Sequence, residues 1–199
     1  MTIDISESKV AQNEMGMWLE WTLATAFGML LGFLPSIIFV NSLDLALARI
    51  IVPLFAGFLV GLAQWFVLRK YVNSVSDWIW SAGASWAVGY ALGLLIINGL
   101  TGTGLDGYIG YILFGAIVGL VQWPVLRREI PNVWIWILAN VIGWTAGFFL
   151  SQVALDLFFN GPAIAPVAST AVISGVSGLV AGAITGVALV MIVRQPERV

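Results

Sequence analysis

One sequence motif, GxxxGxxQWxVLR, occurs at residues 57–69 and again at 115–127, and this repetition restricts the fold more than any other feature of the chain. A third copy at 182–194 keeps both glycines and the arginine, but Leu189 and Val190 replace the glutamine and the tryptophan. Self-similarity of this kind indicates a chain built from copies of one structural unit. The sequence therefore predicts three such units.

The apolar composition places most of the chain in lipid. Of its 199 residues, 60% are hydrophobic and 9% are charged, which leaves too little polar surface for a soluble globule. A bilayer core of about 30 Å is crossed by about 20 helical residues, and helices satisfy their own backbone hydrogen bonds there. The apolar stretches that fit this length are 18–40, 50–68, 78–97, 108–126, 134–157 and 170–193.

The predicted fold class is all-α, an integral membrane bundle of six transmembrane helices built from three parallel two-helix repeats in a pseudo-threefold arrangement. The repeats cover about 17–70, 71–128 and 129–195. Because each unit spans the membrane twice, every copy enters from the same side, unlike the inverted repeats of many transporters. Residues 1–16 are polar and lack signal-peptide features, so we expect a cytoplasmic N-terminal tail before a single transmembrane domain at 17–199.

Basic residues predict the orientation of the bundle. Seven of the eight fall on one predicted side: Lys9, Arg69, Lys70, Arg127, Arg128, Arg194 and Arg198. The positive-inside rule places that side, and both termini, in the cytoplasm, and we expect a multi-pass protein of the bacterial inner (plasma) membrane. We interpret the tryptophans near the same side as an interfacial aromatic belt. They are Trp18, Trp21, Trp65, Trp78, Trp80, Trp123, Trp134 and Trp136.

Small residues recur at helical spacing and predict where the helices pack. Lipid tails are as apolar as leucine, so close backbone approach and dispersion contacts bring helices together in a membrane. The glycines expected at these contacts are Gly57, Gly61, Gly115, Gly119, Gly143, Gly147, Gly182 and Gly186.

Amide side chains recur at one predicted depth. Gln64 and Gln122 lie five residues before an arginine, about 7.5 Å deeper in the bilayer at the rise of an α-helix. Asn140 enters at a similar depth, and with Thr25 and Ser81 these residues are candidates for one polar layer in the cytoplasmic half of the membrane. One interpretation is interhelical hydrogen bonding that holds the bundle together. The other is a polar binding site or a cytoplasmic vestibule.

Two of the arginines follow a tryptophan by four residues, Arg69 after Trp65 and Arg127 after Trp123. This spacing places each guanidinium over its indole on one helix face. Arg194 ends the third copy without a tryptophan before it. Interfacial arginines extend to lipid headgroups, and a cytoplasmic partner is the other contact that these five residues suggest.

The residue inventory argues against catalysis. The chain has no histidine and no cysteine, which removes the usual zinc and haem ligands and most imidazole and thiol chemistry. Its acidic residues fall in predicted links or near helix ends, where solvation accounts for them. We therefore expect no enzyme activity, no metal and no cofactor. The net charge of -2 gives no reason to expect a nucleic-acid partner.

The repeated hairpin with its GxxxGxxQWxVLR ending resembles a loosely defined group of bacterial polytopic membrane proteins that have no assigned activity. The resemblance covers most of the second to fifth predicted helices, and the third copy departs from it at Leu189 and Val190. It implies no catalytic or binding residue.

These observations favour a non-catalytic membrane module that acts as a scaffold, binds a membrane-protein partner or forms a homo-oligomer, in contact with membrane lipids. The alternative is a channel or carrier for a small neutral or amphipathic solute, which would use the amide layer. A pigment or quinone site between helices is a third hypothesis, since aromatic clefts accept such molecules without a histidine ligand.

Overall fold

The fold is all-helical throughout the part of the chain that the structure describes. The computed structural model describes residues 5–34, 45–73, 75–99, 106–130, 132–159 and 165–194. The helices in these residues are α1 (Ile5–Phe33), α3 (Leu45–Leu68), α4 (Trp78–Gly99), α5 (Asp106–Arg127), α6 (Ile135–Phe159) and α7 (Pro166–Val193). The expected tail at 1–16 is helical from Ile5 onward, and its first four residues lie outside the described part. Parts of the links between the apolar stretches, at 41–44, 100–105 and 160–164, also lie outside it.

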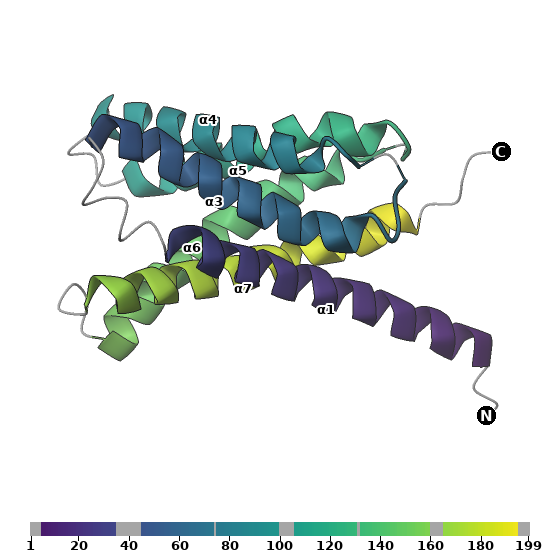
Figure 1. Cartoon of the computed structure of the whole chain (residues 1–199). Helices are drawn as coiled ribbons and strands as arrows, with labels where there is room; N and C mark the ends of the chain where they lie inside the picture. The colour runs from purple at the N-terminus through teal and green to yellow at the C-terminus, as the bar shows by residue number, and fades with distance from the viewer. Residues whose placement is uncertain are drawn as a thin grey trace.

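The helices form a closed ring. Each one packs against the helix before it and the helix after it, and α7 packs against α1, which closes the bundle (Figure 1). The helices α1, α4 and α6 begin at the end of the bundle where α3, α5 and α7 finish. The start of α1 and the finish of α7 therefore share one end of the molecule.

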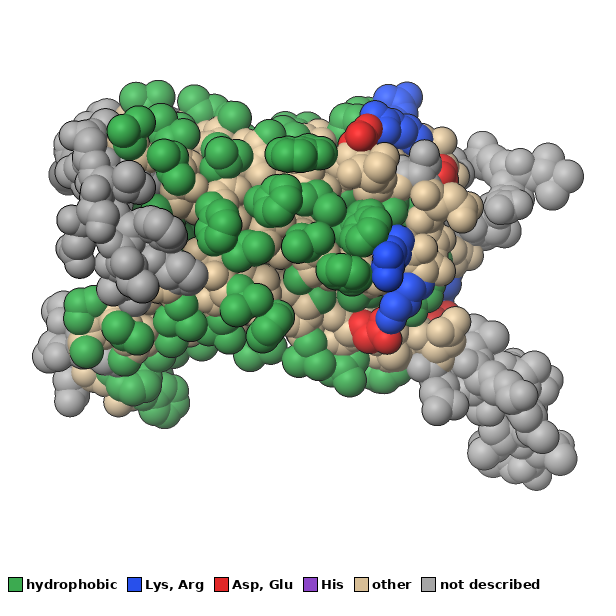
Figure 2. Space-filling model, in the orientation of Figure 1, with side chains coloured by type: hydrophobic (Ala, Val, Ile, Leu, Met, Phe, Trp, Pro, Cys, Tyr) green, Lys and Arg blue, Asp and Glu red, His purple; other side chains and the backbone are tan. Residues whose placement is uncertain are grey.

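Four helices are long and apolar enough to cross a membrane, namely α3, α5, α6 and α7. Within the described residues, α1 and α4 do not meet the same measure of length and hydropathy. Apolar side chains cover the flank of the bundle in Figure 2, and charged side chains gather at one end. This distribution is typical of a membrane protein.

Glycine allows close backbone approach at the helix–helix contacts. A Cβ atom added to Gly28 in α1 would lie 2.7 Å from the Cα of Val60 in α3, and one added to Gly115 would lie 2.6 Å from the carbonyl oxygen of Asn140. At every glycine that the sequence pattern places at a packing contact, an added Cβ would lie within 3.3 Å of another helix: Gly57, Gly61, Gly115, Gly119, Gly143, Gly147, Gly182 and Gly186. At six of these glycines the nearest atom would lie closer than 3.0 Å, so a larger side chain would force its neighbour to shift. At Gly143 and Gly186, where that distance is 3.3 and 3.1 Å, the neighbour would have to give by a few tenths of an ångström.

Three tryptophans meet inside the ring. The indoles of Trp21, Trp78 and Trp136, which occupy equal positions in the aligned repeats, contact one another edge to face with ring centroids 5.6 to 5.9 Å apart. Each is at most 1% exposed. The interpretation of these three as part of an interfacial belt is therefore wrong. Sequence spacing places these tryptophans correctly in one layer of the bundle, but the rotation of each helix turns their side chains toward the core.

Candidate functional site

The predicted amide layer lies directly beside the three central indoles. The Nε1 of Trp78 donates a hydrogen bond to the Oε1 of Gln64 at 3.3 Å, and the Nε1 of Trp136 donates to the Oε1 of Gln122 at 3.2 Å. In both pairs the glutamine lies on the helix that precedes the tryptophan. Gln64 also donates from Nε2 to the hydroxyl of Thr25 in α1 at 2.9 Å. The same amide thus connects α1, α3 and α4.

In the third copy of the repeat, the buried indole N–H has a different hydrogen-bond acceptor. Leu189 stands where the other copies have glutamine, and the Nε1 of Trp21 instead donates to the hydroxyl of Thr185 at 3.0 Å. Thr185 lies one helical turn before Leu189 on α7. Sequence reasoning did not single out Thr185. The available signal was the missing glutamine itself, because a buried indole N–H needs another acceptor nearby.

Asn140 is buried like the two glutamines, but in the described residues it forms hydrogen bonds only within its own helix, as Ser81 does. The Nδ2 of Asn140 donates to the carbonyl oxygen of Trp136 at 2.9 Å, and its Oδ1 accepts a hydrogen bond from the Nε1 of Trp144 at 3.1 Å. The hydroxyl of Ser81 donates to the carbonyl oxygen of Trp78 in its own helix at 2.8 Å. Gln64 and Gln122 therefore connect neighbouring helices at the level of the indoles, whereas Asn140 and Ser81 do not.

The cationic end has two matching arginine–tryptophan stacks. The guanidinium carbon of Arg69 lies 4.6 Å from the ring centre of Trp65, and that of Arg127 lies 4.6 Å from the ring centre of Trp123. Within the described residues neither arginine forms an ion pair. Their charges therefore remain available for an anionic contact at this end of the bundle.

Two exposed ion pairs lie beside these stacks. Lys70, just after α3, contacts Glu20 of α1 at 2.8 Å, and Arg128, just after α5, contacts Asp77, just before α4, at 2.5 Å. All four side chains are about half exposed, so solvent screening leaves these pairs a small contribution to stability. Burial, and secondarily the charge of Glu20, raise the pKa of the neighbouring Tyr71 phenol, which keeps it neutral.

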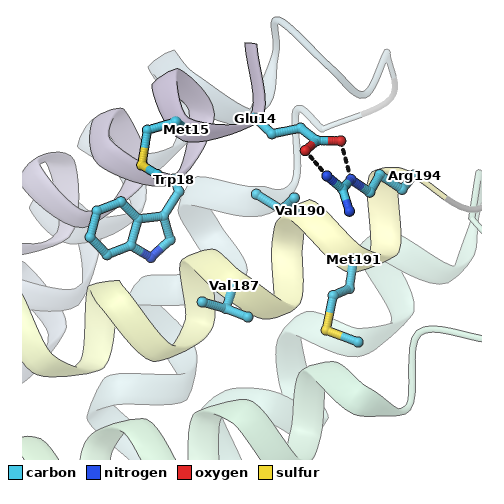
Figure 3. A pocket seen from close by; sticks show the side chains of 7 residues that line it. All are labelled: Glu14, Met15, Trp18, Val187, Val190, Met191 and Arg194. Carbon is cyan, nitrogen blue, oxygen red and sulfur yellow. Dashed lines mark hydrogen bonds and ion pairs between the residues drawn. The ribbon is translucent and has the colours of Figure 1, made fainter. Parts of the chain in front are cut away.

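A groove lies where the third copy lacks its tryptophan. It has a volume of about 470 Å³ and runs between the start of α1 and the end of α7 (Figure 3). Its walls are Glu14, Met15, Trp18, Val187, Val190, Met191 and Arg194. In the aligned repeats Val190 holds the position of Trp65 and Trp123. A smaller side chain therefore stands in the groove wall at the position that tryptophan holds in the other two copies.

Arg194 has a different partner from the other repeat arginines. No tryptophan lies four residues before Arg194, and its guanidinium instead forms a bidentate ion pair with the carboxylate of Glu14 at the rim of the groove (Figure 3). Glu14 is mostly buried in this contact. The groove is therefore apolar along its length and closed by a paired charge at one end.

The described site offers hydrogen bonds, apolar contact and cationic surface. Within the described ranges there is no group of three histidine, cysteine, aspartate or glutamate residues that could hold a metal ion. Comparison with protein-family models, with curated proteins and with solved structures found no match. Function therefore has to be inferred from the contacts within the chain.

Proposed function

We propose that this protein is a non-catalytic, six-span protein of the bacterial inner membrane that binds the transmembrane helix of another membrane protein along the groove between α1 and α7. Both termini lie in the cytoplasm, and the three two-helix repeats surround a pseudo-threefold axis. The observation that carries the proposal is the groove at Val190, where two sister copies have tryptophan.

The pseudo-threefold arrangement is supported by contacts between residues at equal positions of the repeats. Trp21, Trp78 and Trp136 meet in one layer. Eight residues further along the same helices, Trp86 and Trp144 contact each other with ring centroids 5.0 Å apart. Met29, the third member of that set, is buried in the same apolar cluster. Equivalent side chains converge in two successive layers, as expected of three similar hairpins around one axis.

The cytoplasmic orientation is supported by the charge distribution. Arg69, Lys70, Arg127, Arg128 and Arg194 follow the ends of α3, α5 and α7, which lie at the same end of the bundle (Figure 2). Cytoplasmic loops of membrane proteins carry an excess of lysine and arginine. The stacked Arg69 and Arg127 are suited to anionic lipid headgroups, which are abundant in the cytoplasmic leaflet.

A binding role is favoured over catalysis or transport by how the polar groups are used. The carboxylates of Glu14, Glu20 and Asp77 are engaged in ion pairs at the charged end. The amides of Gln64 and Gln122 are at most 4% exposed and accept hydrogen bonds from indoles that fill the axis. This packing gives the channel alternative no support, because a pore would need its lining side chains to face water.

The chemistry of the groove specifies its occupant. Its lining is mostly apolar and includes Val190, which stands where the other two repeats have tryptophan. The ion pair of Glu14 and Arg194 leaves no net charge at the rim. The fitting partner is therefore a transmembrane helix that presents an aromatic side chain near the cytoplasmic interface, where tryptophan and tyrosine are common.

Site-specific photo-cross-linking tests this proposal. A photoreactive phenylalanine analogue replaces Val187 or Met191 in the groove, and Val88 on the apolar flank is the control position, since its side chain is similarly exposed at 48%. We expect the groove positions, but not position 88, to cross-link to a membrane-spanning peptide of another protein with an aromatic residue within one turn of the link. Mass spectrometry identifies the peptide.

A second pair of variants makes the test specific. Val190→Trp fills the groove with the residue of the sister repeats and should abolish the cross-link, while Val88→Trp should leave it unchanged. Cross-links to lipid alone, or to a second copy of this chain, would contradict the proposed partner. So would a cross-link that persists in Val190→Trp.

A further inference from the structure

A second hollow lies inside the other half of the bundle, far from the groove. This cavity has a volume of about 270 Å³, and its walls come from α1, α4, α5, α6 and α7. On α7 it is lined by Thr170 and Ser174, about 30 Å before Arg194 at the helical rise of 1.5 Å per residue. The cavity therefore belongs to the end opposite the cationic residues.

Aromatic rings form most of its wall. Tyr111 and Phe148 are stacked with ring centroids 5.0 Å apart and an interplanar angle of 28°. Trp86 and Phe114 meet edge to face at 5.2 Å. Tyr90 completes the aromatic lining. Such walls present both ring faces and ring edges, the two surfaces on which another aromatic ring packs favourably.

The size of the space matches one substituted ring. An apolar cavity of about 150 Å³ accepts a benzene molecule, so about 270 Å³ leaves room for ring substituents. An adjoining hollow of about 250 Å³ shares Tyr90, Tyr111, Phe114 and Phe148 with the cavity. It extends between α4 and α5 past Gly93 and Gly110, and this extension gives a substituent on the ring a way toward the flank.

One residue of the cavity wall carries an indole donor that lacks an acceptor. Trp86 lines it and is 1% exposed, and within the described residues its Nε1 has no hydrogen-bond partner. The aligned repeat explains why. Trp144, at the equal position, donates to Asn140 four residues earlier, whereas the residue four before Trp86 is Ala82. Buried indole N–H groups usually have a hydrogen-bond partner, so the unpaired Nε1 of Trp86 is a donor that a bound ligand could satisfy.

The other polar groups of the wall are also uncharged. Tyr90 and Tyr111 contribute to the lining, and their hydroxyls form no hydrogen bond within the described ranges. No lysine, arginine, aspartate or glutamate takes part in the lining. A ligand with a net charge would therefore lose its hydration without gaining a counter-ion, which excludes it on energetic grounds.

We propose that this cavity binds a neutral, flat ring compound with carbonyl oxygens, the chemistry of a quinone headgroup. The aromatic walls hold the ring, and the indole N–H of Trp86 and the tyrosine hydroxyls donate to the carbonyl oxygens. The cavity and the groove share no lining residue, so a test that refutes ligand binding in the cavity leaves the proposed partner binding in the groove unaffected.

The test is a titration of the purified full-length protein with 2,3-dimethoxy-5-methyl-1,4-benzoquinone, a soluble quinone headgroup without a tail. Binding is measured by calorimetry, and we expect saturation at one molecule per chain. Trp86→Phe keeps the ring but removes the donor, and it should weaken affinity about 5- to 10-fold, the effect of one hydrogen bond. Trp21→Phe makes the same change at a buried tryptophan whose ring partners, Trp78 and Trp136, lie outside the cavity lining, and it should leave affinity unchanged.

A further variant and a second ligand complete the test. Tyr111→Phe removes one hydroxyl without changing the ring, so it remains informative if Trp86→Phe fails to fold, and it should also weaken binding several-fold. Absence of saturable binding would overturn the proposal. So would equal affinity in the wild type, Trp86→Phe and Tyr111→Phe, or saturable binding of oleate in place of the quinone, which would identify the cavity as a lipid-tail site.

Discussion

The hydrogen bond between Trp21 and Thr185 gives the sharpest test of how the third repeat is stabilised. Thr185→Val keeps the shape of the side chain but removes the hydroxyl that accepts the Trp21 indole N–H at 3.0 Å. Both residues are buried, at 0% and 3% exposure, so water cannot replace the acceptor. Interhelical hydrogen bonds in membranes contribute about 0.6 to 2 kcal/mol, and we expect a loss of stability in that range.

The missing acceptor can be restored from the sister repeats. Leu189 holds the position at which Gln64 and Gln122 accept from their tryptophans, so Leu189→Gln supplies an amide where the repeat pattern puts one. We expect Leu189→Gln to destabilise the wild-type protein, whose indole is already satisfied, but to recover stability in the Thr185→Val background. The two changes should therefore couple by about 1 kcal/mol or more in a double-mutant cycle.

Unfolding by sodium dodecyl sulfate in mixed micelles, followed by tryptophan fluorescence, measures these differences. Thr22→Val is the matched control, because its hydroxyl donates only to the carbonyl oxygen of Trp18 in its own helix. The reasoning is refuted if Thr185→Val is no less stable than Thr22→Val. It is also refuted if Leu189→Gln lowers stability equally in both backgrounds, since the two positions would then not serve the same indole.

Two further predictions concern packing and surface charge. Gly28→Ala should lower the free energy of unfolding by about 1 to 3 kcal/mol, because the new Cβ would lie 2.7 Å from the Cα of Val60. Gly16→Ala is the control in the same unfolding assay and should be neutral, because a Cβ at that position would have no atom within 4 Å. Glu20→Gln should change stability by less than about 1 kcal/mol, because its pair with Lys70 is half exposed, and the difference from wild type should shrink further in high salt. A loss of several kcal/mol there would mean that the pair is shielded from solvent.

The repeat pattern predicts the helical architecture well because period and depth are encoded locally. Spacing of three and four residues places Gly57 and Gly61 on one face, and this face meets α4 in the structure. The resulting bundle is all-helical, and four of its helices have the length and hydropathy of membrane spans. The bounds of the helices agree with the apolar stretches to within a few residues, except that α1 begins at Ile5.

Helix rotation is what the sequence does not reveal. Trp78 and Trp80 lie two residues apart at nearly one depth, yet Trp78 is fully buried and Trp80 is 72% exposed. A helix that is apolar on all sides gives no amphipathic signal to separate its core face from its lipid face. For the same reason, the sequence does not show which polar side chains bond to other helices. Gln64 bonds across the bundle to Thr25 and Trp78, while Ser81 at a similar depth bonds only within its own helix.

The two candidate sites arise where the repeats differ from one another. Val190 replaces a tryptophan and leaves the groove, and Ala82 replaces the asparagine that would accept from Trp86 and leaves a free donor in the aromatic cavity. Alignment of the repeats shows these differences, but whether a difference produces an opening depends on the neighbouring helices. Only the three-dimensional packing supplies that information.

The most direct test of the central claim is the number of membrane crossings and the side on which the termini lie. The chain has no cysteine, so single cysteines can be placed without background at Ser8, Ser76 and Glu197 on one predicted side and at Ser42, Thr103 and Asn160 on the other. In intact cells, a membrane-impermeant maleimide should label only the second set, and the first set should react after the inner membrane is opened. Labelling of Ser8→Cys and Glu197→Cys from opposite sides, or of Thr103→Cys only from the cytoplasm, would contradict a bundle of three parallel hairpins.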